Sequence, residues 1–136
     1  MGVAVITGAA QGLGRVTAEL LARNGFDVVL TDVQPVDPVV GELRAQGLNA
    51  SGMTGDVSSA AFVTDLAEWV AGSHGRADIL VNNAGISLIQ PAEETTLDQW
   101  QTVMAVNLQG PFLLCREFGK QMLAAGAGSI VNVASI

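Results

Sequence analysis

A glycine-rich stretch near the N-terminus has the residue types and spacing that phosphate binding requires. The stretch TGAAQGLG occupies residues 7–14 and lies between the apolar run Val3–Ile6 and a helical pattern that begins near Leu13. A strand, a glycine turn and a helix start in this order let backbone N–H groups approach a pyrophosphate without obstruction by Cβ. The helix dipole favours negative charge at the same place. The stretch therefore predicts a dinucleotide site, although an ordinary turn between a strand and a helix can carry the same glycines.

An acidic residue follows the second apolar run of the chain. Asp32 comes directly after residues 26–31, where a carboxylate can accept hydrogen bonds from the adenosine ribose and repel a 2′-phosphate. Neither Gln11 in the turn nor Val33 beside the aspartate is the cation that a 2′-phosphate would need. Arg15 lies on the expected helix, where exposure to solvent and contact with a phosphate both remain open. We therefore expect NAD rather than NADP as the cofactor.

Apolar runs alternate with helical patterns along the whole chain, which is typical of βαβ units and a parallel sheet. Strands are expected at residues 3–6, 26–31, 49–54, 79–81 and 130–133. Helices are expected from residue 13 to 24, 37 to 47, 58 or 59 to about 72, from 96, and from 111 to 124. The fold class is α/β, a Rossmann-like doubly wound parallel sheet of five strands within three α/β/α layers.

Two of the expected helices carry apolar stripes whose burial can be predicted. The first helix should bury one face, formed by Leu13, Val16, Leu20 and Leu21. The helix that starts at residue 96 has the capping-box spacing Thr96 to Gln99. It should turn three apolar side chains inward, those of Trp100, Val103 and Met104.

The composition bounds the class of protein. A chain of 136 residues, 49% hydrophobic and 14% charged, fits one domain, residues 1–136, with a buried core. No apolar run approaches the length of a membrane span, and the N-terminus lacks the pattern of a signal peptide, so a cytoplasmic location is expected. A net charge of −7 argues against nucleic acid and anionic membranes as partners. One cysteine, Cys115, and one histidine, His74, favour neither a disulfide nor a metal site; we expect a buried thiol and an exposed imidazole.

Small and polar residues follow the third and fourth strands as well. Asp56-Val57 comes after the third strand and the tetrapeptide NNAG, residues 82–85, after the fourth. Each pair or tetrapeptide alone is ordinary turn chemistry. Together with TGAAQGLG, in this order, they resemble the short-chain dehydrogenase/reductase family, in which a TGxxxGxG turn and an NNAG motif are diagnostic. The resemblance spans the whole chain and implies hydride transfer between a nicotinamide and a secondary alcohol or ketone, as in 3-oxoacyl reductases or polyol and diol dehydrogenases.

The resemblance also implies the site residues. The expected cofactor-binding positions are Gly8, Ala10, Gln11, Gly12, Leu13, Gly14, Asp32, Asp56, Val57, Asn83, Ala84 and Gly85. The catalytic asparagine of the family corresponds to Asn107, and the serine that polarises the substrate carbonyl corresponds to Ser135. The implied partners are a small alcohol or ketone and further copies of the chain, in a dimer or tetramer assembled through the helix that holds residues 112–122.

One part of the family pattern is missing from the sequence. The general acid/base of the family is a tyrosine in a Tyr-x-x-x-Lys motif beyond the serine, but this chain contains no tyrosine. Its one lysine, Lys120, is expected to be a solvated cation in a long helix. The chain therefore matches the N-terminal portion of the family fold, without the C-terminal part. It is either that portion of an NAD-dependent dehydrogenase or a nucleotide-binding fragment without turnover. A Rossmann-like methyltransferase is a third alternative, but it gives NNAG and Asn107 no role.

Overall fold

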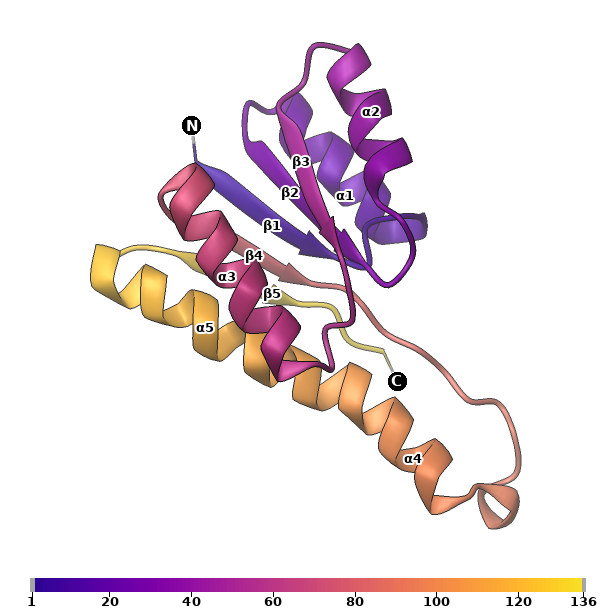
Figure 1. Cartoon of the computed structure of the whole chain (residues 1–136). Coiled ribbons are helices and arrows are strands. Elements are labelled where there is room, and N and C mark those ends of the chain that lie inside the picture. Colours follow the sequence, from indigo (N-terminus) through magenta and orange to yellow (C-terminus); the bar gives the residue numbers. More distant parts are fainter. Residues whose placement is uncertain (1, 136) are drawn as a thin grey trace.

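The computed structural model describes residues 2–135 and confirms the α/β architecture (Figure 1). The strands are β1 (Val3–Thr7), β2 (Asp27–Asp32), β3 (Ala50–Thr54), β4 (Ile79–Asn82) and β5 (Ser129–Asn132). All neighbouring strands pair in parallel, in the order β3-β2-β1-β4-β5. The chain reverses its direction of travel across the sheet between β1 and β4. Such a switch point leaves a crevice at the carboxyl ends of the two strands, where ligands of this fold class bind.

Five α-helices connect the strands. They are α1 (Gly12–Arg23), α2 (Asp37–Ala45), α3 (Ala60–His74), α4 (Leu97–Met104) and α5 (Gly110–Ala125). A short 3₁₀ helix, η1 (Ala92–Glu94), precedes α4, and a π-helical segment, η2 (Ala105–Gln109), joins α4 to α5 without a break. No helix in residues 2–135 is both long and apolar enough to cross a bilayer.

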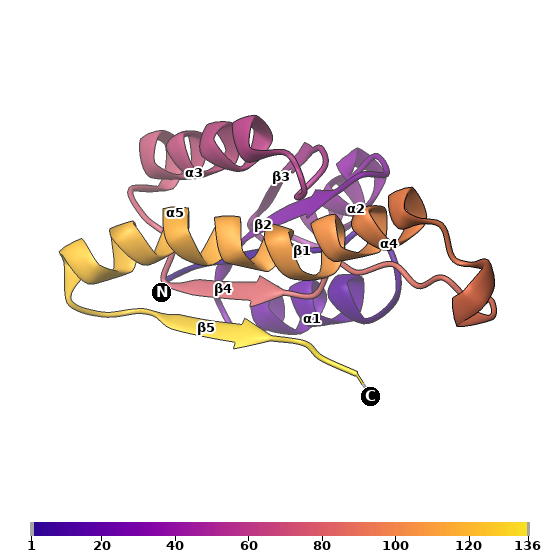
Figure 2. The same cartoon turned by 90° about the horizontal axis from the view of Figure 1, so that it is seen from below.

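The sheet separates two apolar cores, because successive side chains of a strand point to opposite faces. Val3 and Val5 of β1 belong to the core under α3 and α5, which includes the fully buried Phe118. Ala4 and Ile6 belong to the core under α1 and α2. Figure 2 shows α3 and α5 on one side of the sheet and α1 on the other. The expected three layers are therefore present.

The packing of α1 corrects the prediction for its buried face. Three of the four expected core residues are 61% exposed, namely Leu13, Val16 and Leu20. The helix instead buries small residues at four-residue spacing, which are Gly14, Ala18 and Ala22. The reason is a close approach to the glycine turn, since a Cβ on Gly14 would lie 2.2 Å from the carbonyl oxygen of Gly8. Larger side chains on this face would push the helix away from β1.

The prediction for α4 is also wrong about burial, although its start is confirmed. Thr96 Oγ1 accepts the N–H of Gln99 and Gln99 Oε1 accepts the N–H of Thr96, which completes the capping box. Trp100 is 53% exposed, while Val103 and Met104 are half-buried. Figure 1 shows that α4 projects beyond the end of the sheet. The helix has no sheet face beneath it, so its apolar stripe stays largely uncovered.

The remaining single residues differ in part from expectation. His74 is half-buried rather than exposed. Its Nε2 lies 3.1 Å from the hydroxyl of Ser51, near the start of β3. Cys115 is half-buried rather than a full core residue. Lys120 is exposed as expected and pairs with Glu117 at 2.8 Å. Hydrogen bonds from Lys120 and then from Arg116 hold the pKa of the Glu117 carboxyl below its ordinary value.

Gln121 links three parts of the fold. Its Nε2 donates to the carbonyl of Ala67 in α3 at 2.9 Å, and its Oε1 accepts the N–H of Ala77, before β4, at 3.0 Å. Ala77 is fully buried, so its N–H needs this partner.

We expect Gln121→Leu to lower the free energy of unfolding by about 1–3 kcal/mol, the cost of an unsatisfied buried donor. Urea denaturation measures this, with Gln101→Leu on the exposed side of α4 as the matched control. Equal midpoints for the two variants would contradict it.

Candidate active site

Two adjoining pockets lie at the carboxyl edge of the sheet, around the switch point between β1 and β4. The smaller, of about 360 Å³, is lined by eight of the expected cofactor-binding residues: Gly8, Gln11, Asp32, Asp56, Val57, Asn83, Ala84 and Gly85. The larger, of about 810 Å³, is lined by both expected catalytic residues, Asn107 and Ser135. The two pockets share a common wall, formed by Asn83, Ala84, Gly85 and Ile86. A ligand that fills the smaller pocket can therefore reach the larger one past the NNAG loop.

The other expected cofactor-binding residues form the turn and helix start beside the smaller pocket. Gly8 and Gly12 have φ values of +65° and +56°, which favour glycine. Within the described chain, no side chain caps the start of α1, and its first turn, with Gly12, Leu13 and Gly14, holds no acidic residue. Backbone donors at such a helix start suit a pyrophosphate. The turn is thus compatible with the dinucleotide that its sequence predicts.

The Asp32 carboxylate is fixed by two backbone donors. Its Oδ2 accepts the N–H of Ala10 at 3.0 Å, and its Oδ1 accepts the N–H of Gln34 at 3.0 Å. Asp56 is held in the same way, because its Oδ1 accepts the N–H and the hydroxyl of Ser58 at 2.8 and 2.7 Å. The described lining of the smaller pocket thus holds two carboxylates and no basic side chain. This charge suits ribose hydroxyls and opposes a 2′-phosphate.

Thr7 ties the glycine turn to the NNAG loop, a role that motif reasoning missed. The hydroxyl of this buried residue accepts the N–H of Asn83 at 3.0 Å and the N–H of Ala84 at 2.9 Å, and donates to the carbonyl of Val81. Asn83 adds a second link between the loop and the turn, since its Nδ2 donates to the carbonyls of Thr7 and Gly8 at 3.1 and 3.2 Å. The signal was available as the first letter of TGAAQGLG.

We expect Thr7→Val to destabilise the fold by about 2–4 kcal/mol, because the valine keeps the shape but leaves two N–H groups of the loop without their acceptor. Binding of NADH should weaken at the same time, since the loop is the wall between the pockets. Urea denaturation and fluorescence titration measure the two effects. Thr7→Ser keeps the hydroxyl and is the control. If the valine and serine variants unfold at the same urea concentration, the hydroxyl does not hold the loop.

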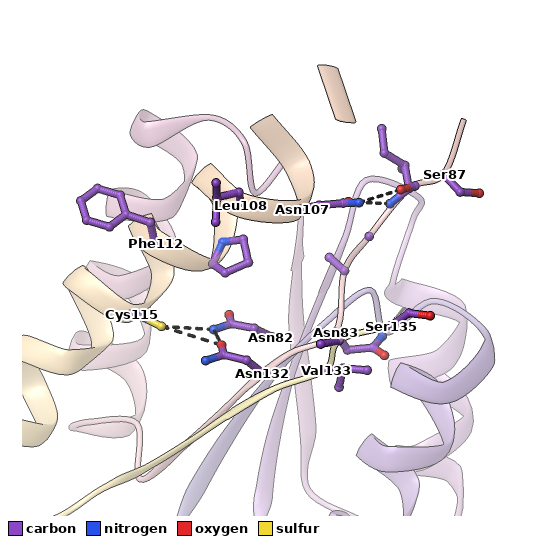
Figure 3. A pocket seen from close by; sticks show the side chains of 15 residues that line it. Asn82, Asn83, Ser87, Asn107, Leu108, Phe112, Cys115, Asn132, Val133 and Ser135 are labelled. Atoms are coloured by element: carbon purple, nitrogen blue, oxygen red, sulfur yellow. Dashed lines mark hydrogen bonds between the residues drawn. The ribbon is translucent and has the colours of Figure 1, made fainter. Parts of the chain in front are cut away.

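Asn107 lies in the π-helical segment η2 and faces the loop after NNAG (Figure 3). Its Oδ1 accepts the N–H of Ile86 at 2.9 Å and its Nδ2 donates to the carbonyl of Ile86 at 2.8 Å. A π-helical turn inside a helix often marks a functional site. Both polar atoms of the side chain are thus engaged in holding the loop against the start of α5.

Ser135 follows β5 and lines the larger pocket with Asn107. The pairing of β4 and β5 continues one residue past the strand, since the N–H of Val133 donates to the carbonyl of Asn82 at 2.9 Å. At the ends of these two strands, Asn82 Nδ2 donates to Asn132 Oδ1 at 2.7 Å and to Cys115 Sγ at 3.3 Å (Figure 3). This part-buried link joins β4, β5 and α5 in the wall of the larger pocket, which all three side chains line. Sequence reasoning missed Asn132, whose signal was a polar residue inside an apolar strand.

The whole described chain matches the family model described as short chain dehydrogenase, over residues 2–136. This chain belongs to the short-chain dehydrogenase family. The match decides against the methyltransferase alternative. D-threitol dehydrogenase of Mycolicibacterium smegmatis is 42% identical over 135 residues, which cover 98% of this chain and 52% of that protein. NAD-dependent glycerol dehydrogenase of Listeria innocua is 35% identical, with coverages of 98% and 52%.

Solved structures of the short-chain dehydrogenase family have the same fold. A metagenomic short-chain oxidoreductase in complex with NADP is 39% identical with a TM-score of 0.93, and the match covers 99% of this chain and 62% of that one. The chain spans about half the length of the curated relatives that it matches.

Proposed function

We propose that this chain carries the cofactor site, and part of the catalytic site, of an NAD-dependent oxidoreductase that interconverts a secondary alcohol and a ketone. The observation that carries the proposal is the wall shared by the two pockets. It lets one extended ligand run from Asp32, at the adenosine end, to the pocket of Asn107 and Ser135. The glycine turn lies along the way, at the place that a pyrophosphate would take.

Each residue has a separate part in the proposed reaction. The nicotinamide, when bound, supplies the acceptor or donor of hydride. The hydroxyl of Ser135 donates a hydrogen bond to the substrate oxygen and stabilises the charge that develops there. Asn107 holds the loop after NNAG through Ile86. Since the sequence contains no tyrosine, the proton of the alcohol passes to a group that residues 1–136 do not contribute.

We propose a polyol as the substrate class. Two relatives are named for threitol and glycerol, which are small polyols. The larger pocket is lined by several polar side chains, including Ser87, Asn107 and Asn132, which can form hydrogen bonds with hydroxyl groups.

Assembly into a dimer or tetramer through α5 is supported by the exposed Phe112 and Leu123. A cytoplasmic location stays a prediction.

A second candidate function is nucleotide binding without turnover by these residues alone. The absence of tyrosine from the sequence favours it. The two candidates share the cofactor site and differ only in chemistry, so turnover by the protein extended to the full length of its relatives separates them.

Calorimetric titration tests the cofactor, and a coupled assay tests the reaction. We expect the chain to bind NADH at least about tenfold more tightly than NADPH, because a carboxylate opposes the 2′-phosphate. The protein extended to the full length of its relatives should reduce NAD⁺ with threitol or glycerol. Preference for NADPH would overturn the cofactor assignment, and failure to bind either dinucleotide would overturn the function.

A further inference from the structure

The cation nearest the start of α1 is held by a neighbouring helix. Arg15 lies in the first turn of α1, and its backbone N–H donates to the carbonyl of Gln11, which lines the smaller pocket. Its guanidinium forms an ion pair with the carboxylate of Glu42 in α2. Both side chains are about half exposed, at 42% and 53%. The pair therefore bridges the two helices at the surface.

The other basic residues of the chain are committed elsewhere. Arg23 pairs with Glu19 at the far end of α1, two turns and more from the pocket. Arg44 donates to the carbonyl of Ala50 at the start of β3. The start of this strand is at the end of the sheet that faces away from the two pockets. The last three are Arg76, paired with Asp78, and Arg116 and Lys120, both paired with Glu117 on α5. Among the six basic residues, Arg15 lies closest along the chain to a residue that lines the smaller pocket, Gln11.

We propose that Glu42 is a residue that determines cofactor selectivity, because it keeps Arg15 from a 2′-phosphate. This inference rests on the proposed dinucleotide site. A guanidinium binds phosphate well when its donors are free. Engaged by Glu42, the guanidinium charge is neutralised at the surface, while the lining of the smaller pocket carries the carboxylates of Asp32 and Asp56. Asp32 thus opposes the 2′-phosphate directly, and Glu42 removes the one cation that could offset it.

The expected size of the effect follows from the exposure of the pair. Surface ion pairs contribute little, since solvent and salt screen them. Releasing Arg15 should therefore change the affinity for a 2′-phosphate by about threefold to tenfold, and not by orders of magnitude. The change should shrink as the salt concentration rises.

Two small probes test the inference without any turnover. 5′-AMP and 2′,5′-ADP differ in the 2′-phosphate, and both need only the adenosine end of the site. Calorimetry at low salt would compare the chain with Glu42→Gln, with Arg15→Gln and with the double variant. Glu19→Gln is the matched control, because it removes the same charge from an exposed pair with Arg23.

Glu42→Gln is expected to tighten 2′,5′-ADP about threefold to tenfold and to leave 5′-AMP unchanged. The gain should vanish in the double variant. An equal gain in Glu19→Gln would show an effect of net charge, and a gain that survives in the double variant would show that Arg15 is not involved. Either result overturns the inference. If neither probe binds to any form of the chain, the proposed dinucleotide site itself fails, which is a distinct outcome.

Discussion

Replacing Ser135 by alanine is expected to lower kcat of the full-length protein by about 10²- to 10³-fold, the usual cost of removing one hydrogen-bond donor from a developing oxyanion. Ser135 lines the same pocket as Asn107, beyond the wall of Asn83 to Ile86. KM should change much less, because the donor acts mainly where charge develops in the transition state. Steady-state kinetics with a polyol and NAD⁺ measure both constants.

Ser129→Ala provides the control for this variant. Ser129 begins the same strand, β5, and pairs with Ile79 through its backbone, so its side chain is remote from the pocket. The control should keep full activity. NADH should bind equally to all three forms, which separates chemistry from folding. Full activity in the Ser135 variant would overturn the catalytic assignment.

Replacing Gly14 by alanine is expected to cost about 3 kcal/mol of stability or to prevent folding, because overpacking against backbone is not relieved by a rotamer change. The new Cβ would lie 2.2 Å from the carbonyl oxygen of Gly8 and 2.6 Å from Nδ2 of Asn83. The helix would have to move away from the glycine turn, which breaks the contact that shapes the smaller pocket. Thermal denaturation and NADH titration measure the two consequences.

Gly41→Ala is the matched control, since this glycine also lies within a helix, α2, and a Cβ there would meet nothing within 4 Å. Alanine favours helix by about 1 kcal/mol over glycine, so the control should be stabilised. The same substitution thus has opposite signs at the two positions. A stabilised Gly14→Ala variant would show that α1 does not need its close approach to β1.

The local pattern of the sequence was sufficient for the elements and the motifs. Strands and turns depend on periodicity, glycine and proline over a few residues, which is why even the weakly patterned β3 is where it was expected. The NNAG motif and TGAAQGLG were sufficient for the family, which the family match confirms. The meeting of Asp32, Asp56 and Asn83 at one edge also followed from the sequence, because parallel strands bring their carboxyl ends together.

Contacts between distant segments decided the rest. Apolar periodicity marks a helix stripe, but only the sheet decides which stripe it covers; α1 presents glycine and alanine to β1, and α4 extends past the sheet with Trp100 uncovered. In the same way, the hydrogen bonds of Thr7 reach a loop 76 and 77 residues away, and Glu42 meets Arg15 across two helices. The sequence by itself determined which residues stand at the strand ends, whereas the tertiary structure decided which partners engage them, because those partners are brought together by packing and not by spacing along the chain.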